Sequence, residues 1–212
     1  MLPFFLIMAS FLGSPLAPVS VSNDLETLAG ARILWSASPG QARVVSRIRL
    51  PTLGKTNRER GRHFLARYGA LTGGAALRFE SESTSKARTV LRYRQWHNNV
   101  VILNRSATVT VDGEGHIIAF NSDCVPITEA APQVVDEQAA RDAASKAIQA
   151  KYGSKPTGLK AIDAGFGLMA NGSYVVPVFE FHIAPLPMLS HVKVRIDAST
   201  GALLSIRNTL IH

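Results

Sequence analysis

The chain has 212 residues, of which 46% are hydrophobic and 18% charged, and its formal net charge is +8. This composition is typical of a folded globular protein and not of a disordered one. The single cysteine, Cys124, excludes an intramolecular disulfide framework, a zinc site built from several thiolates and a two-cysteine redox motif. The 16 glycines and 11 prolines are ordinary counts, so a collagen-like or low-complexity chain is excluded as well.

Positive charge is concentrated in one part of the chain. Residues 32–105 contain 15 Lys and Arg but only three acids, a local charge of +12, whereas residues 106–212 carry a charge of −2. Asp24 and Glu26 account for the remaining difference. A basic half joined to a nearly neutral half indicates two modules and an acidic partner for the first. The alternative is a solvated, arginine-rich surface that has no partner.

The amino terminus is typical of a secretory signal peptide. Residues 1–22 contain no charge, and an apolar run from Phe4 to Leu12 is followed by small residues. The run is too short to span a membrane, so we predict cleavage after Ala17 or after Ser22 and a secreted or periplasmic protein. No Lys or Arg precedes the apolar run, unlike in a typical signal peptide, which leaves a buried N-terminal strand as the alternative.

A strand and a helix are predicted next. Residues 44–50 (Val-Val-Ser-Arg-Ile-Arg-Leu) alternate in their second half and predict a strand that ends at Pro51. Thr56 and Glu59 have the spacing of a capping box and therefore predict the start of a helix. Apolar side chains then recur at helical spacing as far as the Gly73-Gly74 stop: Phe64, Leu65, Tyr68 and Leu71.

An antiparallel meander is predicted to follow this helix. Residues 77–79 open it, and residues 90–96 alternate large apolar or aromatic side chains with polar ones. Residues 108–111 and 117–120 form a hairpin across an Asp-Gly-Glu-Gly link, whose glycines supply the backbone freedom that a tight turn requires. We expect one face of this sheet to be buried against the preceding helix.

The second half repeats this order after a boundary at residues 130–133. Asp136 is expected to cap an alanine-rich helix that ends at Gly153. Strands are then predicted over residues 174–181, 192–196 and 203–206. The predicted fold class is therefore α+β, with two modules that each consist of a helix packed on an antiparallel β-sheet.

Sequence motifs of enzymes are absent. The chain has no His-Glu-x-x-His, no phosphate-binding loop, no dinucleotide glycine fingerprint and no Gly-x-Ser-x-Gly elbow. His182 and His191 can face each other across a hairpin, but a hydrogen-bonded strand histidine is favoured over a metal ligand. Cys124 follows Asp123 and lacks the cationic setting of a reactive thiolate, so we expect a structural thiol. We predict a non-enzymatic protein with no metal and no cofactor.

Several segments of the first half resemble the fungalysin/thermolysin propeptide (FTP) domain. Residues 64–73 (Phe-Leu-Ala-Arg-Tyr-Gly-Ala-Leu-Thr-Gly) are similar to the helix that opens that domain. Residues 90–95 resemble its strand with an Arg/Tyr-x-Gln end, and residues 98–104 stand where the family usually has Gly-Val-Pro-Val-Phe-Gly. A hairpin like that of residues 109–118 follows there.

The second half resembles a PepSY domain. Residues 137–152 correspond to its alanine-rich helix, and residues 194–204 (Val-Arg-Ile-Asp-Ala-Ser-Thr-Gly-Ala-Leu-Leu) resemble its closing hairpin. Together the two resemblances cover residues 44–208. They imply a signal peptide at residues 1–22, an FTP-like domain at residues 23–130 and a PepSY-like domain at residues 131–212.

The chain departs from the family in two respects. Asn99, Val101 and Asn104 replace the family's Gly, Pro and Gly, so we expect a straighter segment and an altered contact with a protease. The metalloprotease catalytic domain does not occur within these residues. A free-standing protein, a processed product and a fragment of a zymogen are all compatible with this.

The resemblance implies a propeptide-like protein that acts as chaperone and/or inhibitor of a thermolysin-type zinc metalloprotease, in cis or in trans. The residues expected to bind the protease are three on one strand and four in the C-terminal tail: Arg92, Arg94, Gln95, Thr209, Leu210, Ile211 and His212. The tail is expected to lie in the catalytic cleft as a cleavage product does. No membrane span is expected after removal of the signal peptide.

Two alternatives remain open at this point. PepSY-like domains also occur in cell-envelope binding modules that have no protease partner. Nucleic-acid binding is the other, because Tyr93 and Trp96 lie among arginines and can stack on bases. Strand alternation, however, places Tyr93 on the face opposite Arg92 and Arg94, and export removes the protein from cellular nucleic acid. We therefore expect no nucleic-acid partner.

Overall fold

The computed structural model describes residue 28 and residues 30–36, 42–153, 165–183 and 192–208. The predicted signal peptide, residues 1–22, lies outside the described residues. So do His191 and the four tail residues Thr209, Leu210, Ile211 and His212.

The predicted first helix forms with the predicted cap. Helix α2 spans Asn57–Arg67, and a short 3-10 helix, η1, continues it over Gly69–Thr72. The Thr56 hydroxyl accepts a hydrogen bond from the Glu59 amide at 3.2 Å, and the Glu59 carboxylate accepts one from the Thr56 amide at 3.1 Å. This reciprocal pair satisfies two of the amides that a helix start leaves free, which confirms the capping box.

The strands of the first half pair antiparallel in the order β1-β2-β7-β6-β5-β4, and β3 also pairs with β7. The strands predicted after the helix, over residues 77–79, 90–96, 108–111 and 117–120, lie within the longer strands β4 to β7, which confirms the predicted antiparallel meander. The bounds are β1 Arg32–Trp35, β2 Ala42–Ser46, β3 Leu50–Pro51, β4 Ala76–Ser85, β5 Arg88–His97, β6 Val100–Asp112 and β7 His116–Ser122.

The prediction of one continuous strand over residues 44–50 was wrong. Arg47 has a φ of 59°, in the left-handed region, and this bend ends β2 at Ser46. The chain then returns to the same edge of β7 as β3, where Leu50 pairs with Ile117. The apolar alternation of these residues persists across the bend, which is why the sequence pattern did not reveal the break.

The second half contains helix α3, Glu137–Tyr152, and a group of strands around it. The Asp136 carboxylate accepts a hydrogen bond from the Ala139 amide at 2.8 Å, as predicted for the helix cap, and Gly153 ends the helix at a φ of 71°. The strands are β8 Glu129–Ala130, β9 Gly165–Asn171, β10 Tyr174–Ile183, β11 Val192–Asp197 and β12 Leu203–Asn208. Of these, β8 and β9 were not predicted.

Strand β6 connects the two halves into one hydrogen-bonded sheet, where two separate sheets were expected. One edge of β6 pairs with β5 from Val100 to Asp112. On its other edge residues 107–111 pair with β7, whereas Ile102 near its start pairs in parallel with Leu168 of β9. The Asn104 side chain reinforces this junction, because its amide both donates to the Ala170 carbonyl and accepts from the Ala170 amide, each at 2.9 Å. The α+β class of the fold is as predicted, but the sheet is mixed at this junction.

Each helix covers one part of the sheet, and apolar side chains fill the space beneath it. Under α2 the buried residues include Phe64, Leu91 and Phe120. Under α3 the small side chains Ala140 and Ala144 allow a close approach to the sheet, where a second group of apolar residues lies: Phe179, Phe181, Val194 and Ile196. A third, smaller cluster lies at the junction of β6 with β9: Ile102, Leu168, Ala170 and Val175.

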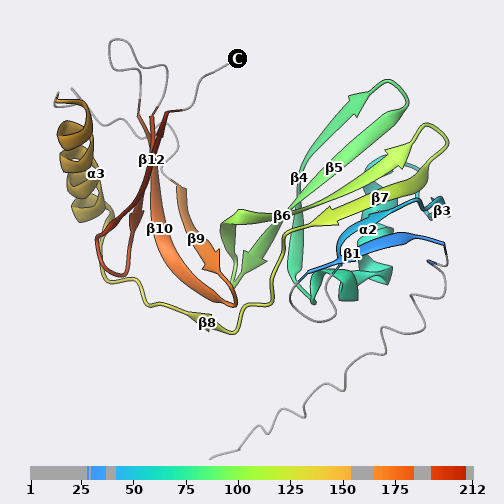
Figure 1. Ribbon diagram of the computed structural model, residues 1–212, viewed down its shortest axis with the longest axis horizontal. Coiled ribbons are helices and arrows are strands. Elements are labelled where there is room, and N and C mark those ends of the chain that lie inside the picture. Colours follow the sequence, from blue (N-terminus) through green and yellow to red (C-terminus); the bar gives the residue numbers. More distant parts are fainter. Residues whose placement is uncertain (1–27, 29, 37–41, 154–164, 184–191, 209–212) are drawn as a thin grey trace, which may run out of the picture.

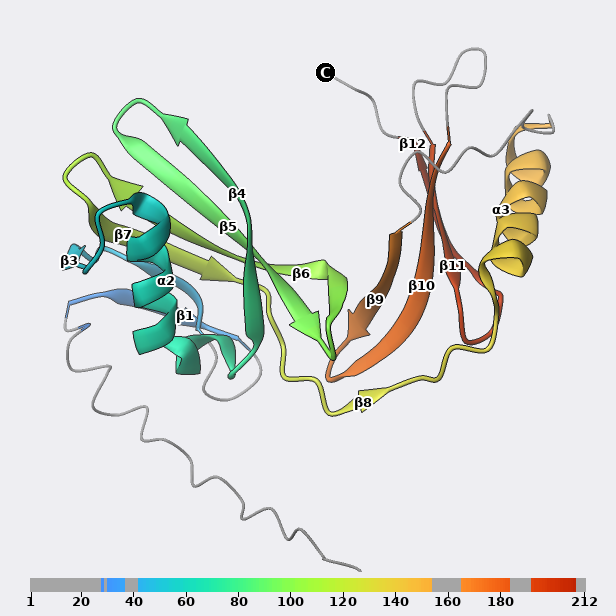
Figure 2. The ribbon, with the colours of Figure 1, turned by 180° about the vertical axis from the view of Figure 1, so that it is seen from behind.

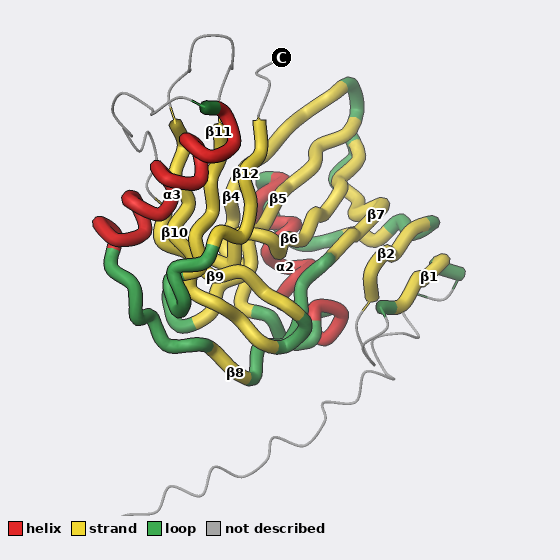
Figure 3. Tube along the Cα trace, turned by 60° about the vertical axis from the view of Figure 1, so that its left-hand side comes forward, coloured by secondary structure: helices red, strands yellow, loops and turns green. Residues whose placement is uncertain are grey.

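Helix α3 lies at one end of the molecule, and α2 lies behind the strands of the first half in the views of Figures 1 and 3. The opposite faces of the two parts of the sheet are not covered by a described helix. These two uncovered faces are where the polar and charged strand residues project, because alternate residues of a strand point to opposite faces.

Candidate functional site

The first uncovered face carries the arginines that were predicted to bind a partner. Strand register places Arg92 opposite Thr108, which in turn lies opposite Asn121, and places Arg94 opposite Ser106. We call these five residues the first open face. Leu91 and Tyr93, the residues on either side of Arg92, are buried on the α2 side, as the alternation predicted.

The two arginines of the first open face differ in their freedom to bind a partner. The Arg94 guanidinium bonds to the Glu80 carboxylate at 2.5 Å and donates to the Leu103 carbonyl at 3.0 Å. The Arg92 side chain is exposed and forms no ion pair or hydrogen bond with any other described residue. Arg94 is therefore held in place, whereas Arg92 is available to a carboxylate of a partner.

Gln95 does not lie on this face. Its side chain is 2% exposed and forms two hydrogen bonds with the backbone of Val125, donating at 2.6 Å and accepting at 3.1 Å. These bonds connect β5 to the segment after β7. The structure therefore places Gln95 in the interior, away from Arg92 and Arg94, and its polar atoms are already satisfied.

The second uncovered face contains a charged cluster that the sequence analysis missed. Three side chains surround the Glu180 carboxylate: Arg195 at 2.6 Å, His182 at 2.8 Å and Lys193 at 2.9 Å. Register pairs Glu180 with Arg195 and His182 with Lys193, and Lys193 lies opposite Arg207 on β12. We call these five residues the second open face.

Glu180 is nearly buried, with a side chain that is 10% exposed. Burial alone would raise the pKa of its carboxyl group. Hydrogen bonds from His182, Lys193 and Arg195, together with the charge of Arg195, outweigh this and lower the pKa to about 2. The carboxylate is thus ionised at neutral pH, and the cations around it exceed its charge.

A sequence signal for this cluster does exist. The segments Phe-Glu-Phe-His (residues 179–182) and Val-Lys-Val-Arg (residues 192–195) alternate strictly, so each places its charged residues on one face. Pairing these strands as neighbours would have brought the carboxylate and the cations together. The favoured interpretation of His182 as a hydrogen-bonded strand histidine agrees with its bond to Glu180, whereas a position facing His191 is not tested, because His191 lies outside the described residues.

No catalytic constellation is present among the described residues. No group of three or more His, Cys, Asp and Glu side chains lies close enough there to hold a metal ion. Cys124 is buried, and this burial raises the pKa of its thiol to about 11, which opposes formation of a nucleophilic thiolate. None of the described helices is long and apolar enough to cross a membrane.

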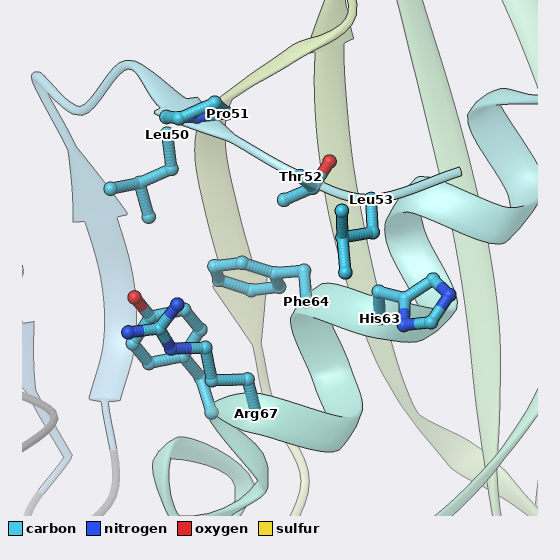
Figure 4. A pocket seen from close by; sticks show the side chains of 8 residues that line it. Leu50, Pro51, Thr52, Leu53, His63, Phe64 and Arg67 are labelled. Atoms are coloured by element: carbon cyan, nitrogen blue, oxygen red, sulfur yellow. The ribbon is translucent and has the colours of Figure 1, made fainter. Parts of the chain in front are cut away.

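An apolar hollow of about 360 Å³ lies between α2 and residues 50–53. Figure 4 shows Phe64 in it, with His63 and Arg67 of the helix nearby and with Leu50 and Leu53 from the other side. His63, Arg67 and Tyr68 are its ionisable side chains, and no carboxylate lines it. It therefore contains no acid–base pair and contributes no chemistry to the site.

Comparison with known proteins gives little support for assigning a family. No family model matches the chain, and no curated protein matches its sequence. Among solved structures, the chain is similar to the Bacillus megaterium YpeB C-terminal domain, with 11% sequence identity and a TM-score of 0.43 over 94% of this chain and 100% of that chain. A similarity at this level transfers neither a fold nor a function, so the FTP and PepSY domains remain predictions.

Proposed function

We propose that this protein binds the catalytic domain of a thermolysin-type zinc metalloprotease and acts as its chaperone and/or inhibitor. In this proposal an exported chain, after loss of residues 1–22, uses two helix-on-sheet modules, an FTP-like one at residues 23–130 and a PepSY-like one at residues 131–212. The observation that carries the proposal is that two uncovered, cation-rich sheet faces exist without a catalytic group beside them among the described residues. Such faces suit docking to an acidic protein.

The first open face supplies the free charge for docking. Arg92 projects beside Thr108 and Asn121, whose short polar side chains add hydrogen-bonding groups without competing charge. Arg94 is already oriented by Glu80, so it loses little further side-chain entropy when a partner binds. A carboxylate on the partner would pair with Arg92 and approach the Arg94–Glu80 pair.

The second open face supplies a pre-organised excess of positive charge. Lys193 and Arg207 are directly opposed on neighbouring strands, an arrangement that is unfavourable for like charges. Glu180 offsets this on the Lys193 side, whereas Arg207 is exposed and forms no ion pair with a described residue. An acidic group of a partner would pair with Arg207 and so neutralise the remaining positive charge of this face.

A rigid sheet of this kind can act as a template for an unfinished partner. Binding to the native catalytic domain, and not to its unfolded chain, stabilises the folded state by mass action. Because the protein would stay bound to the catalytic domain after that domain has folded, it would then inhibit the protease. In this proposal Thr209, Leu210 and Ile211 lie in the catalytic cleft, and the imidazole of His212 approaches the zinc ion.

The proposal can be tested with the thermolysin-type metalloprotease encoded nearest to the gene, prepared without its own propeptide. Refolding yield and peptidase activity are measured while the purified protein is titrated in. We expect a higher refolding yield, or inhibition that saturates at one equivalent. The variant Arg92→Glu should weaken both effects, whereas the matched charge reversal Lys146→Glu on the outer side of α3 should not. No change in yield and no inhibition would reject the proposal.

A further inference from the structure

Strand β4 leaves a free edge on the first half of the sheet. It pairs only with β5 among the described strands, so along its other side alternate backbone amides and carbonyls have no strand partner. Figure 2 shows the start of β4 next to η1, on the same side of the molecule as α2. A free edge of this kind accepts an added strand.

The space between α2 and the start of β4 is an apolar groove. Helix α2 packs mainly on β5, β6 and β7, so Leu77 and Phe79 of β4 extend beyond its cover and are only half-buried. Two hollows of about 410 Å³ and about 330 Å³ lie along this line, and both are lined by Arg62, Leu77 and Tyr93. We call this combined hollow the β4 groove.

The rim of the β4 groove is basic. The Arg58 guanidinium lies 4.2 Å from the centre of the Phe79 ring, and Arg62 is exposed on the next turn of the helix. Neither arginine forms an ion pair with a described residue. The Glu59 carboxylate also lines this space, but it accepts hydrogen bonds from the Lys55 and Thr56 amides. The rim therefore favours an acidic ligand.

An unsatisfied polar atom lies at the base of the β4 groove. Tyr93 is 4% exposed, and its hydroxyl has no hydrogen-bond partner among the described residues. Burial raises the pKa of this hydroxyl to about 12, so it stays protonated and able to donate. The hydroxyl lies against Gly61 of α2, so a ligand in the groove would contact the Tyr93 ring and not its hydroxyl.

We propose that the β4 groove binds an extended segment of a partner protein as an added β-strand. The segment pairs with the backbone of residues 76–79. Because alternate residues of a strand point to the same face, every second side chain of the segment faces α2. On that face apolar side chains pack on Leu77 and Phe79, and an acidic side chain between them reaches Arg58 and Arg62. A bulge between Phe79 and Ser81 interrupts the register and ends the pairing there. This surface is separate from the two open faces and does not depend on the proposed function.

The test uses fluorescein-labelled hexapeptides and fluorescence polarisation with the full chain. The probe is acetyl-Val-Thr-Glu-Thr-Val-Thr, whose two valines and glutamate share one face of a strand. It is compared with a version that has lysine in place of the glutamate and with a version N-methylated at alternate amides. We expect saturable binding of the acidic peptide, and at least tenfold weaker binding of both comparison peptides. Equal binding of the lysine or N-methylated peptide, or no binding of the acidic peptide, would overturn the proposal.

Variants locate the binding on the protein. Arg62→Glu should weaken binding of the acidic peptide about tenfold, because it reverses the rim charge. Lys146→Glu makes the same charge change on α3 and should leave binding unchanged, and circular dichroism melts check that each variant is folded. Sedimentation tests the competing occupant, a second copy of this chain. A dimer that Leu77→Lys dissociates would overturn the proposal in favour of self-pairing.

Discussion

The Glu180 cluster gives a prediction whose magnitude follows from the structure. Its folded-state pKa of about 2 lies below the value of 4.5 expected for an unfolded chain. The difference corresponds to about 3 kcal/mol of stability, which is fully present above the unfolded pKa and is lost as the pH falls through the folded pKa. We therefore expect stability to decrease between about pH 5.5 and pH 2.

The variant Glu180→Gln isolates this contribution. It cannot ionise, so its free energy of unfolding should depend less steeply on pH than that of the wild type across this window. At pH 7 the variant should be less stable by about 3 kcal/mol, because Lys193 and Arg195 lose their counter-charge while partly buried. Urea unfolding followed by tryptophan fluorescence at a series of pH values measures both quantities.

A matched control uses another glutamate. Glu129 is exposed in β8 and forms no ion pair with a described residue, so Glu129→Gln should unfold as the wild type does at each pH. Other carboxylates with a lowered pKa, such as Asp112 and Asp197, remain in all three proteins and cancel in the comparison. Parallel pH profiles for the wild type and Glu180→Gln would refute the reasoning about this cluster.

Three further predictions concern stability and reactivity. Replacement Asn104→Ala removes both hydrogen bonds to the β9 backbone and should lower the free energy of unfolding in urea by roughly 1–3 kcal/mol. Gly61→Ala should destabilise by about 1–3 kcal/mol, because its Cβ would overlap with Leu91 and the Tyr93 hydroxyl, whereas Gly69→Ala enters open space and should be nearly neutral. Cys124 should react with a thiol reagent at pH 8 at least ~100-fold faster in urea than in the folded protein, because it is buried with a pKa of about 11.

Each of these has a result that would contradict it. An unchanged urea midpoint for Asn104→Ala would show that the junction of β6 with β9 does not depend on the side-chain amide. Equal effects of alanine at positions 61 and 69 would contradict the close approach of α2 to β5. Rapid labelling of folded Cys124 would contradict its burial in the apolar cluster that contains Phe64, Leu91 and Phe120.

Local patterns in the sequence were sufficient for the helices and for most strands. Both helix caps depend on contacts between residues three apart in the sequence. Thr56 contacts Glu59, and Asp136 contacts Ala139, so a short stretch of sequence is enough to predict them. The hairpin from β6 to β7 likewise follows from strand alternation and a glycine-containing turn.

The junction between the halves was not predictable in this way. Asn104 and Ala170 are 66 residues apart, and no periodicity marks a strand that changes partners along its length. The position of Gln95 was predicted wrongly for a different reason. The same alternation that placed Leu91 and Tyr93 opposite Arg92 also places Gln95 in the interior, but the resemblance to a protease propeptide suggested a contact residue instead.

Direct binding between this protein and a thermolysin-type catalytic domain tests the central claim of a docking role. Isothermal titration calorimetry at low and high salt should give a saturable complex of one to one stoichiometry whose affinity falls as salt screens the arginine-rich faces. Arg92→Glu should weaken this affinity about tenfold, and Lys146→Glu should leave it unchanged. The absence of any binding heat, or an affinity insensitive both to salt and to Arg92→Glu, would contradict the account.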